Sequence, residues 1–127
     1  MELSVGASAD VTHAVAEADT ARSLGSGDVP VLGTPRVLAL LEQATVAAVA
    51  PALADGQTTV GIRVSLEHRV ATPIGRTVTA RARLLGVDGR RLSFEVELLD
   101  GDVVAAFGTV ERAVVDRDRF VSRANGG

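Results

Sequence analysis

A carboxylate lies in the longest apolar stretch of the chain, residues 37–50, where Glu42 has Leu38, Val46 and Val49 as its neighbours on a helix. Apolar residues occupy nearly every angle of the helical wheel, which is typical of a helix enclosed on most sides. Burial raises the pKa of a carboxyl group and a nearby cation or donor lowers it, so Glu42 could serve as a base or a nucleophile. The alternative is a helix edge that reaches solvent, but the apolar wheel favours the functional interpretation.

A histidine lies on the apolar face of an alternating segment that follows this helix. That face consists of Ile62, Val64, Leu66, His68 and Val70. Period-2 alternation predicts a half-buried strand whose apolar face packs on the helix. An isolated inward histidine is more often a hydrogen-bonded core residue than a catalyst, so the importance of His68 depends on a pairing with Glu42. Together the two would form an acid/base pair.

The start of the helix offers a hydroxyl and free backbone amides. Thr34 followed by Pro35 predicts an N-cap and a first helical residue. Capping is the simpler role for Thr34, but the amides near Gly33 and Thr34 could also hold a developing oxyanion. Thr34 precedes Glu42 by eight residues, about 12 Å along a straight helix. If both serve one site, either the helix begins after Thr34 or Thr34 comes from a second subunit, and we favour the second account.

Two further residues have types that could shape a site. Arg112 shares a strand face with Val110 and Val114, and an inward arginine needs a partner. It could position a carboxylate or bind a substrate phosphate, with a structural ion pair as an equal alternative. Gly61 could allow a substrate to approach the backbone closely, although a simple turn would also explain it. We expect His13 to be structural.

The elements before the helix are one strand and one irregular segment. Alternation predicts a strand over residues 10–17. Residues 21–33 are rich in glycine and contain Pro30, a composition that resists regular structure. We expect a mobile surface segment that could serve as a lid over the site.

After the helix, four alternating segments are joined by short turns, which predicts an antiparallel meander. Asp88-Gly89 is a strong signal for a tight hairpin between two of them. The fold class is therefore α+β, with one five-stranded antiparallel sheet wrapped around one long central helix. We expect residues 121–127 to fray. The four segments cover residues 62–70, 78–84, 92–98 and 103–115.

Composition limits the partners. The 127 residues, 46% of them hydrophobic, suffice for a single domain over residues 1–127. A net charge of −3, with 13 basic and 16 acidic residues, gives no basic stripe for nucleic acid. The chain has no cysteine, which excludes a disulfide, a thiolate nucleophile and a thiolate metal site. It has no signal-peptide pattern and no apolar run long enough for a membrane, so we expect a cytoplasmic protein. Edge-to-edge pairing of two sheets would protect exposed edges and favours a homodimer.

Several of these residues also carry a family resemblance. From the first strand to Phe120, the chain resembles the fluoroacetyl-CoA thioesterase group of the hotdog-fold thioesterases. No single motif is specific to this group, but the order and spacing of all the motifs together are. The matching residues are Thr34, Leu41-Glu42, Gly61, His68, Ala71-Thr72-Pro73, Gly75, the hairpin sequence of residues 87–93, and Glu111-Arg112-Ala113-Val114.

The resemblance implies an acyl-CoA thioesterase that acts at a dimer interface without a metal or cofactor. It implies that Thr34, Glu42 and His68 form the catalytic constellation and that Gly61 and Arg112 help to shape the site. One departure concerns the lid, where the fluoroacetyl-specific enzyme uses phenylalanine side chains and residues 21–33 contain none. Specificity for fluoroacetyl-CoA is therefore not implied, and we expect a small or medium acyl group.

Three other functions remain open at this point. A non-catalytic acyl-CoA-binding or ligand-sensing module would have the same fold, since a fold does not determine function. A hydratase acting on an enoyl thioester would need a strongly paired Asp/His arrangement that the sequence does not display. A purely structural domain would leave the inward Glu42 and His68 unexplained. The sequence also leaves open whether Glu42 is nucleophile or general base, and whether dimers assemble further.

Overall fold

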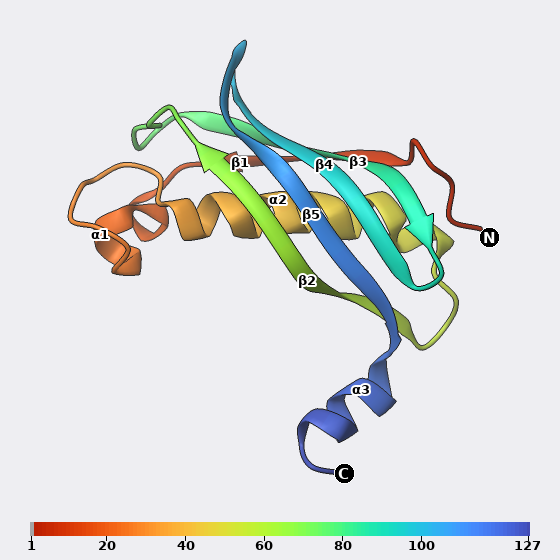
Figure 1. Ribbon diagram of the computed structural model, residues 1–127. Coiled ribbons are helices and arrows are strands. Elements are labelled where there is room, and N and C mark those ends of the chain that lie inside the picture. The colour runs from red at the N-terminus through yellow and green to blue at the C-terminus, as the bar shows by residue number, and fades with distance from the viewer. Residues whose placement is uncertain (1) are drawn as a thin grey trace.

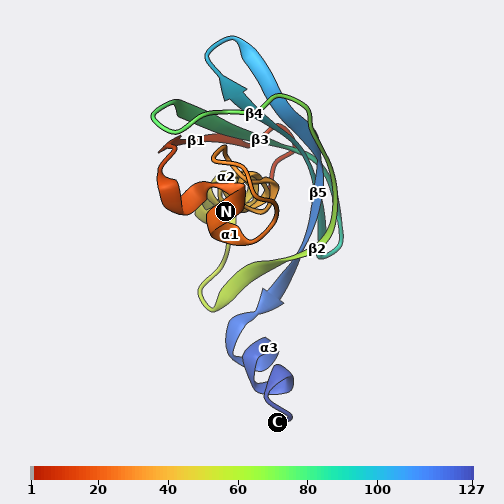
Figure 2. The ribbon, with the colours of Figure 1, turned by 90° about the vertical axis from the view of Figure 1, so that its left-hand side faces the viewer.

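The computed structural model describes residues 2–127, which form one curved antiparallel sheet and one long helix (Figure 1). The view turned by 90° shows the sheet wrapped around α2 (Thr34–Val49) (Figure 2). The expected α+β architecture is thereby confirmed, while Met1 of the expected domain 1–127 lies outside the described residues. The strands are β1 (Ser8–Ala14), β2 (Gln57–His68), β3 (Thr77–Asp88), β4 (Arg91–Asp100) and β5 (Val103–Asp116).

The strand order in the sheet is β1-β3-β4-β5-β2, and every neighbouring pair is antiparallel. Only β3, β4 and β5 form the expected meander. Residues 69–76 are a short connection, yet they carry the chain from β2 at one edge to β3 on the other side of β4 and β5. The pairing of consecutive strands is a tendency that short connections favour but do not enforce. Gly89 and Gly101, both with φ 60°, form the tight turns on either side of β4.

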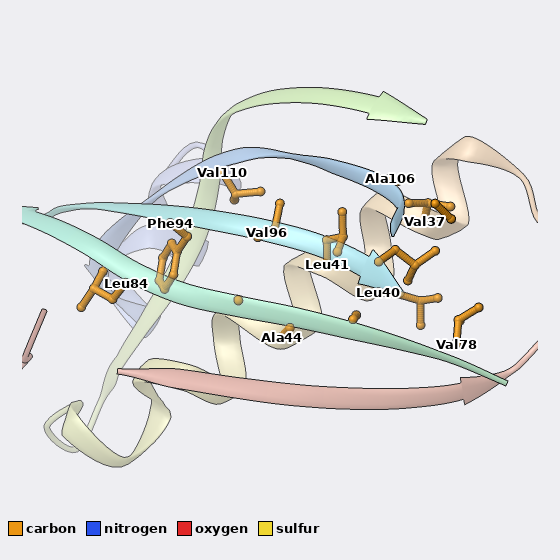
Figure 3. Packing of buried hydrophobic residues seen from close by; sticks show 14 of the residues in the cluster. Val37, Leu40, Leu41, Ala44, Val78, Leu84, Phe94, Val96, Ala106 and Val110 are labelled. Carbon is orange, nitrogen blue, oxygen red and sulfur yellow. The ribbon is translucent and has the colours of Figure 1, made fainter. Parts of the chain in front are cut away.

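The core lies between α2 and the concave faces of β3 and β4, as the alternation predicted. Figure 3 shows the core side chains of the sheet pointing toward α2. The buried side chains of β3 and β4 are Val78, Ala80, Ala82, Leu84, Leu92, Phe94, Val96 and Leu98. They pack in one hydrophobic cluster with Val37, Leu40, Leu41 and Ala44 of α2. With few aromatic residues, the core depends on a close fit of aliphatic side chains.

Two expectations about exposure are wrong for the single chain. The register of β2 shifts between Gly61 and Arg63, and the nearby Ile62 and Val64 are 46% and 40% exposed rather than packed on the helix. Val46 on α2 is 43% exposed, so the helix is not enclosed on most sides. The cause is the position of β2 at the edge of the sheet, where no further strand of the same chain covers it.

Residues 21–33 are more regular than their composition predicts. They begin with the short helix α1 (Ala21–Leu24), which follows the 3-10 helix η1 (Glu17–Asp19). The Ala21 amide donates to the Val31 carbonyl oxygen at 2.9 Å, and the Leu32 amide donates to the Thr72 carbonyl oxygen at 2.9 Å. Backbone hydrogen bonds thus hold both ends of the segment, although glycine and proline disfavour regular structure between them.

The end of the chain forms a helix where fraying was expected. After β5 comes α3 (Arg117–Ala124), which begins where the Asp116 carboxylate accepts a hydrogen bond from the Arg119 amide at 3.0 Å. This N-cap gives the short helix a defined start. A second 3-10 helix, η2 (Ala50–Ala52), extends α2 by one turn. Across residues 2–127, no helix combines the length and apolar character that crossing a membrane requires.

Candidate active site

The first residue of α2 and the last residue of β2 meet at one end of the molecule. Thr34 Oγ1 and His68 Nδ1 lie 2.8 Å apart, within hydrogen-bonding distance. The N-cap of α2 is Gly33, not Thr34, so Pro35 occupies the second helical position rather than the first. Because no side chain caps the helix, the Thr34 hydroxyl is free to bond His68.

The His68 ring has one bonded and one free nitrogen. Nε2 is buried and has no hydrogen-bond partner among residues 2–127. Burial lowers the pKa of His68 from its ordinary value of 6.5, although a backbone hydrogen bond at Val70 acts in the opposite direction. The imidazole is therefore neutral near pH 7. A neutral imidazole with a free nitrogen can accept or transfer a proton.

One of the two expected helix-start amides is already bonded. The Gly33 amide donates to the Asp19 carbonyl oxygen at 2.9 Å and cannot hold an oxyanion. The Thr34 amide makes no hydrogen bond within the part of the chain that the structure describes. Thr34 therefore offers both a hydroxyl and a free backbone donor at the positive end of the α2 dipole.

A second cluster lies two turns further along α2, around Glu42. Arg112 of β5 is 6% exposed, and its Nη1 donates to Glu42 Oε2 at 2.9 Å. Its Nε donates to the Thr59 hydroxyl, and its Nη2 donates to the Thr59 carbonyl oxygen, both at 2.9 Å. Each of the three guanidinium nitrogens donates one hydrogen bond, so within this chain Arg112 positions the Glu42 carboxylate. The sequence reasoning missed Thr59, whose only signal was its place on the inward face of β2.

Gly61 makes room for this carboxylate. A Cβ atom at Gly61 would lie 2.6 Å from Glu42 Oε2, closer than such atoms approach. The Glu42 side chain is 34% exposed and lies in an open groove of about 450 Å³. The carboxylate is thus held by Arg112 on one side and reachable from the other. The groove is lined by Ala39, Glu42, Gln43, Val46, Ala47 and Arg112.

The two clusters are separate within one chain. Thr34 and Glu42 are eight residues apart on the straight helix α2, which spaces their backbones by about 12 Å. No hydrogen bond in residues 2–127 joins Glu42 to His68, so the expected pair does not form inside one chain. The expectation that Thr34 and Glu42 of one site come from different subunits stays a prediction, since Thr34 meets the histidine of its own chain and lies apart from the Glu42 of that chain.

The segment that leads to Thr34 is anchored by a residue that the sequence analysis overlooked. Asp19 is 5% exposed, accepts from the Ala16 amide at 2.8 Å and lies 2.9 Å from His13 Nε2. Its carboxylate also lies 3.0 Å from Nε of Arg36, on the first turn of α2. Burial alone would raise the pKa of Asp19, but the Ala16 amide, His13 and Arg36 together hold it below its ordinary value. The expected structural role of His13 thus has its physical basis in this contact.

The sequence profile of a family described as fluoroacetyl-CoA-specific thioesterase matches residues 15–118. The fluoroacetyl-CoA thioesterase of Streptantibioticus cattleyicolor is 42% identical over 90 residues, which cover 71% of this chain. The matched region spans 65% of that relative's length, slightly less than two thirds.

Solved structures show the same fold over nearly the whole chain. A crystal structure of the fluoroacetyl-CoA thioesterase superposes with a TM-score of 0.92 at 34% identity, covering 99% of this chain and 98% of that one. A mutant of that enzyme in complex with acetyl-CoA gives a TM-score of 0.93 at 33% identity, with 98% of each chain covered. A hot-dog-like protein from Thermanaerovibrio acidaminovorans gives 0.85 at 24% identity, covering 94% and 89%, and shows the fold alone. The hotdog fold expected from the sequence is confirmed.

Proposed function

Because this chain belongs to the fluoroacetyl-CoA-specific thioesterase family, we propose that it hydrolyses an acyl-CoA thioester to the free acid and CoA. One structural observation supports the proposal above all others. His68, bonded to Thr34, keeps a buried Nε2 without a partner in residues 2–127, and the carboxylate of Glu42, anchored by Arg112, lies in an open groove. These are the groups that acyl transfer to water requires, namely a proton carrier, a base or nucleophile, and donors for an oxyanion.

We propose that two copies build the site together, as a homodimer joined along β2. The apolar side chains left exposed around this edge, Val46, Ile62 and Val64, would be covered by a second copy. Two β2 strands that pair antiparallel place the end of one beside the beginning of the other. His68 of one copy would then approach the Glu42 of the second copy. Thr34 and Glu42 of one site would thus come from different subunits, as the sequence analysis favoured.

In this arrangement Glu42 activates the reaction and His68 moves the protons. By the covalent route, Glu42 attacks the thioester carbonyl and expels CoA thiolate, and water then hydrolyses the mixed anhydride. By the other route, Glu42 takes a proton from a water molecule that attacks the carbonyl directly. In the direct route, neutral His68 accepts the proton that Glu42 took from water and passes it to the CoA thiolate. In the covalent route, His68 accepts a proton from the water that hydrolyses the anhydride, and this proton is the one that the thiolate takes up. The Thr34 hydroxyl and amide orient the acyl group and stabilise its oxyanion.

The two routes differ in the fate of the Glu42 oxygen atoms. Hydrolysis of an anhydride at its Glu42 carbonyl would transfer isotopically labelled oxygen from solvent into the Glu42 carboxylate over many turnovers. Mass spectrometry of the peptide that contains Glu42 measures this transfer. A Glu42 carboxylate that stays unlabelled throughout would count against the covalent route and in favour of activated water.

The acyl group is proposed to be small or medium, without selection for fluorine. Residues 21–33 contain no phenylalanine, whereas the resemblance set out above implies that the fluoroacetyl-specific enzyme uses such side chains in its lid. A lid without phenylalanine side chains excludes water less well from the acyl group. Cytoplasmic location is part of the same proposal.

The first test is the release of free CoA thiol from a panel of short, branched and aryl acyl-CoA thioesters. We expect the wild type to turn over at least one, and Glu42→Gln and His68→Ala to fold normally but to lose about a thousandfold in kcat/KM. Binding of acyl-CoA without turnover would instead support a non-catalytic binding module. Hydration of crotonyl-CoA would support the hydratase alternative.

The second test examines the shared site directly. Glu42→Gln and His68→Ala chains are co-expressed with two different affinity tags, and the mixed dimers are purified on both. One site of each mixed dimer then carries both substitutions and the other carries neither. We expect about half of the wild-type activity per dimer, since one of two symmetric sites is intact. Mixed dimers as inactive as the parent variants would show that each site lies within one chain.

A further inference from the structure

The arginines of this chain divide into two sets. Of the 13 basic residues, all arginine, nine lie within 4.0 Å of a carboxylate in residues 2–127. The other four have no ion pair in that part of the chain, although the protein is acidic overall. All four gather at one end of the molecule: Arg90, Arg117, Arg119 and Arg123. An acidic protein with its unpaired cations in one place has a local site for anions.

Three of these arginines line a groove between the end of β5 and α3. The groove has a volume of about 320 Å³ and contains Arg90, Arg119 and Arg123. Its lining also includes Phe120, which is 43% exposed. We name this feature the arginine groove, and its remaining lining residues are Ala113, Val114, Val115 and Asp116.

The carboxylate in the arginine groove does not neutralise these arginines. Asp116 uses Oδ1 to accept the Arg119 amide at 3.0 Å and so caps α3. Arg90, in the turn before β4, is held beside β5, because its Nη1 donates to the Val114 carbonyl oxygen at 3.3 Å and its carbonyl oxygen accepts from the Val114 amide at 2.8 Å. Guanidinium groups near an exposed aromatic ring suit a ligand that combines phosphates with a flat base.

We propose that the arginine groove binds the phosphorylated adenosine end of the CoA thioester whose acyl group lies at the Thr34–His68 end of the second copy. The inference rests on the proposed function and on the proposed β2 pairing. Gln57 at the start of β2 pairs with Asp116, whereas His68 at its end pairs with Ala106. The arginine groove therefore flanks the start of β2, and Figure 1 shows α3 beyond the end of β5, away from α1.

Antiparallel pairing of two β2 strands reverses this separation between copies. The start of β2 in one copy lies beside the end of β2 in the other, which brings the arginine groove of the first toward His68 of the second. A CoA thioester is a long molecule with its acyl group at one end and its phosphates and adenosine at the other. The two ends would thus contact different copies, with the phosphates on Arg119 and Arg123 and the adenine on Phe120.

The test compares a nucleotide-bearing substrate with one that lacks the nucleotide. For the double variant Arg119→Gln/Arg123→Gln, we expect KM for an acyl-CoA to rise about tenfold or more, with kcat unchanged. Kinetics on the matching acyl-pantetheine, which has no adenosine or 3′-phosphate, should not change. The control Arg81→Gln/Arg83→Gln removes the same charge from the outer sheet face and should leave both substrates unaffected. An equal effect of the groove variant on both substrates, or no effect on either, would overturn the proposal.

Calorimetry with adenosine 3′,5′-bisphosphate tests the arginine groove without any turnover. We expect the wild type to bind it, Arg119→Gln/Arg123→Gln to bind at least about tenfold more weakly, and Phe120→Leu to weaken the nucleotide but not inorganic pyrophosphate. Binding of pyrophosphate as tightly as the nucleotide would overturn recognition of the adenosine. If no thioester is hydrolysed while this binding pattern holds, the proposed function fails and the groove assignment stands.

Discussion

The two halves of the candidate site differ in how completely their polar groups are satisfied. Around Glu42, all three nitrogens of Arg112 are bonded, and the network joins α2, β2 and β5. Around Thr34, one hydrogen bond joins two groups, while His68 Nε2 and the Thr34 amide have no partner in residues 2–127. Buried unpaired polar atoms are costly and rare, so where they persist a function is a good hypothesis.

The Glu42 network fixes the position of a side chain by several hydrogen bonds, whereas the Thr34–His68 pair leaves a ring nitrogen without a partner in residues 2–127. The Glu42 network fixes a carboxylate within a rigid frame, and this frame also contributes to folding. The Thr34–His68 pair contributes little to the fold but has free atoms that can contact a substrate. Loss of Arg112, which bonds both Glu42 and Thr59, should therefore alter both stability and activity, whereas substitutions of Thr34 or His68 should alter activity with little change in stability.

The largest effect on stability is expected from Arg112→Ala. Removal of the guanidinium leaves Thr59 and Glu42 without their partner, so we expect unfolding free energy to fall by about 2–4 kcal/mol and kcat/KM by about a hundredfold. Thr34→Val, which keeps the side-chain shape, should reduce activity and change unfolding free energy by less than about 0.5 kcal/mol. Urea unfolding and CoA release measure the two effects. Equal losses of stability in both variants would contradict the proposed difference between the two halves of the site.

A smaller effect, confined to activity, is expected from Gly61→Ala. The added Cβ would lie 2.6 Å from Glu42 Oε2, and because this atom ends a flexible side chain, the carboxylate moves rather than the backbone. We expect about a tenfold loss of kcat/KM with a change in unfolding free energy within about 1 kcal/mol. Gly86→Ala is the matched control, since a Cβ there meets nothing within 4 Å. Unchanged activity of Gly61→Ala would mean that the position of the carboxylate does not limit the rate.

The smallest effect is expected in how stability and activity change with pH as His68 titrates. Because burial lowers the pKa of His68, the unfolded chain binds this proton more readily than the folded one. Stability from neutral His68 is therefore present above pH 6.5 and declines as pH falls below that value. We expect His68 to titrate below 6.5 by NMR, identified by comparison with His68→Gln, and kcat/KM to decline in the same range. A midpoint above 6.5 would contradict a desolvated ring.

The fold followed from the sequence where a local pattern and the tertiary environment agree. Alternation placed Val78 and Leu84, like Phe94 and Leu98, in the core, and Asp88-Gly89 formed the expected hairpin. The strand order could not be predicted from the sequence, because a short connection can lead either to a neighbouring strand or to a distant one. The regular structure of residues 21–33 was missed because it depends on hydrogen bonds to Asp19 and Thr72, which lie outside the segment.

The candidate residues were found by type, but their pairings were not. Glu42, His68 and Arg112 stood out as charged or titratable groups on apolar faces. Nothing in their spacing showed that Arg112 would bond Glu42 while His68 bonded Thr34, since contacts between distant strands depend on the register of the sheet. The partner residue Thr59 precedes the segment 62–70 in which the sequence predicted a strand, and only its contact with Arg112 identified it.

The way in which residues 21–33 are attached has a consequence for how substrate range can evolve. The Ala21–Val31 and Gly33–Asp19 backbone hydrogen bonds hold the base of the loop, while residues 25–30 between them are largely exposed. The sequence of residues 25–30, the tip of the loop, can therefore be changed by mutation or by grafting without displacing Thr34. Under the proposed function, the loop tip would be a separable module, in which acyl preference could diverge among descendants while the Thr34–His68 contact is inherited unchanged.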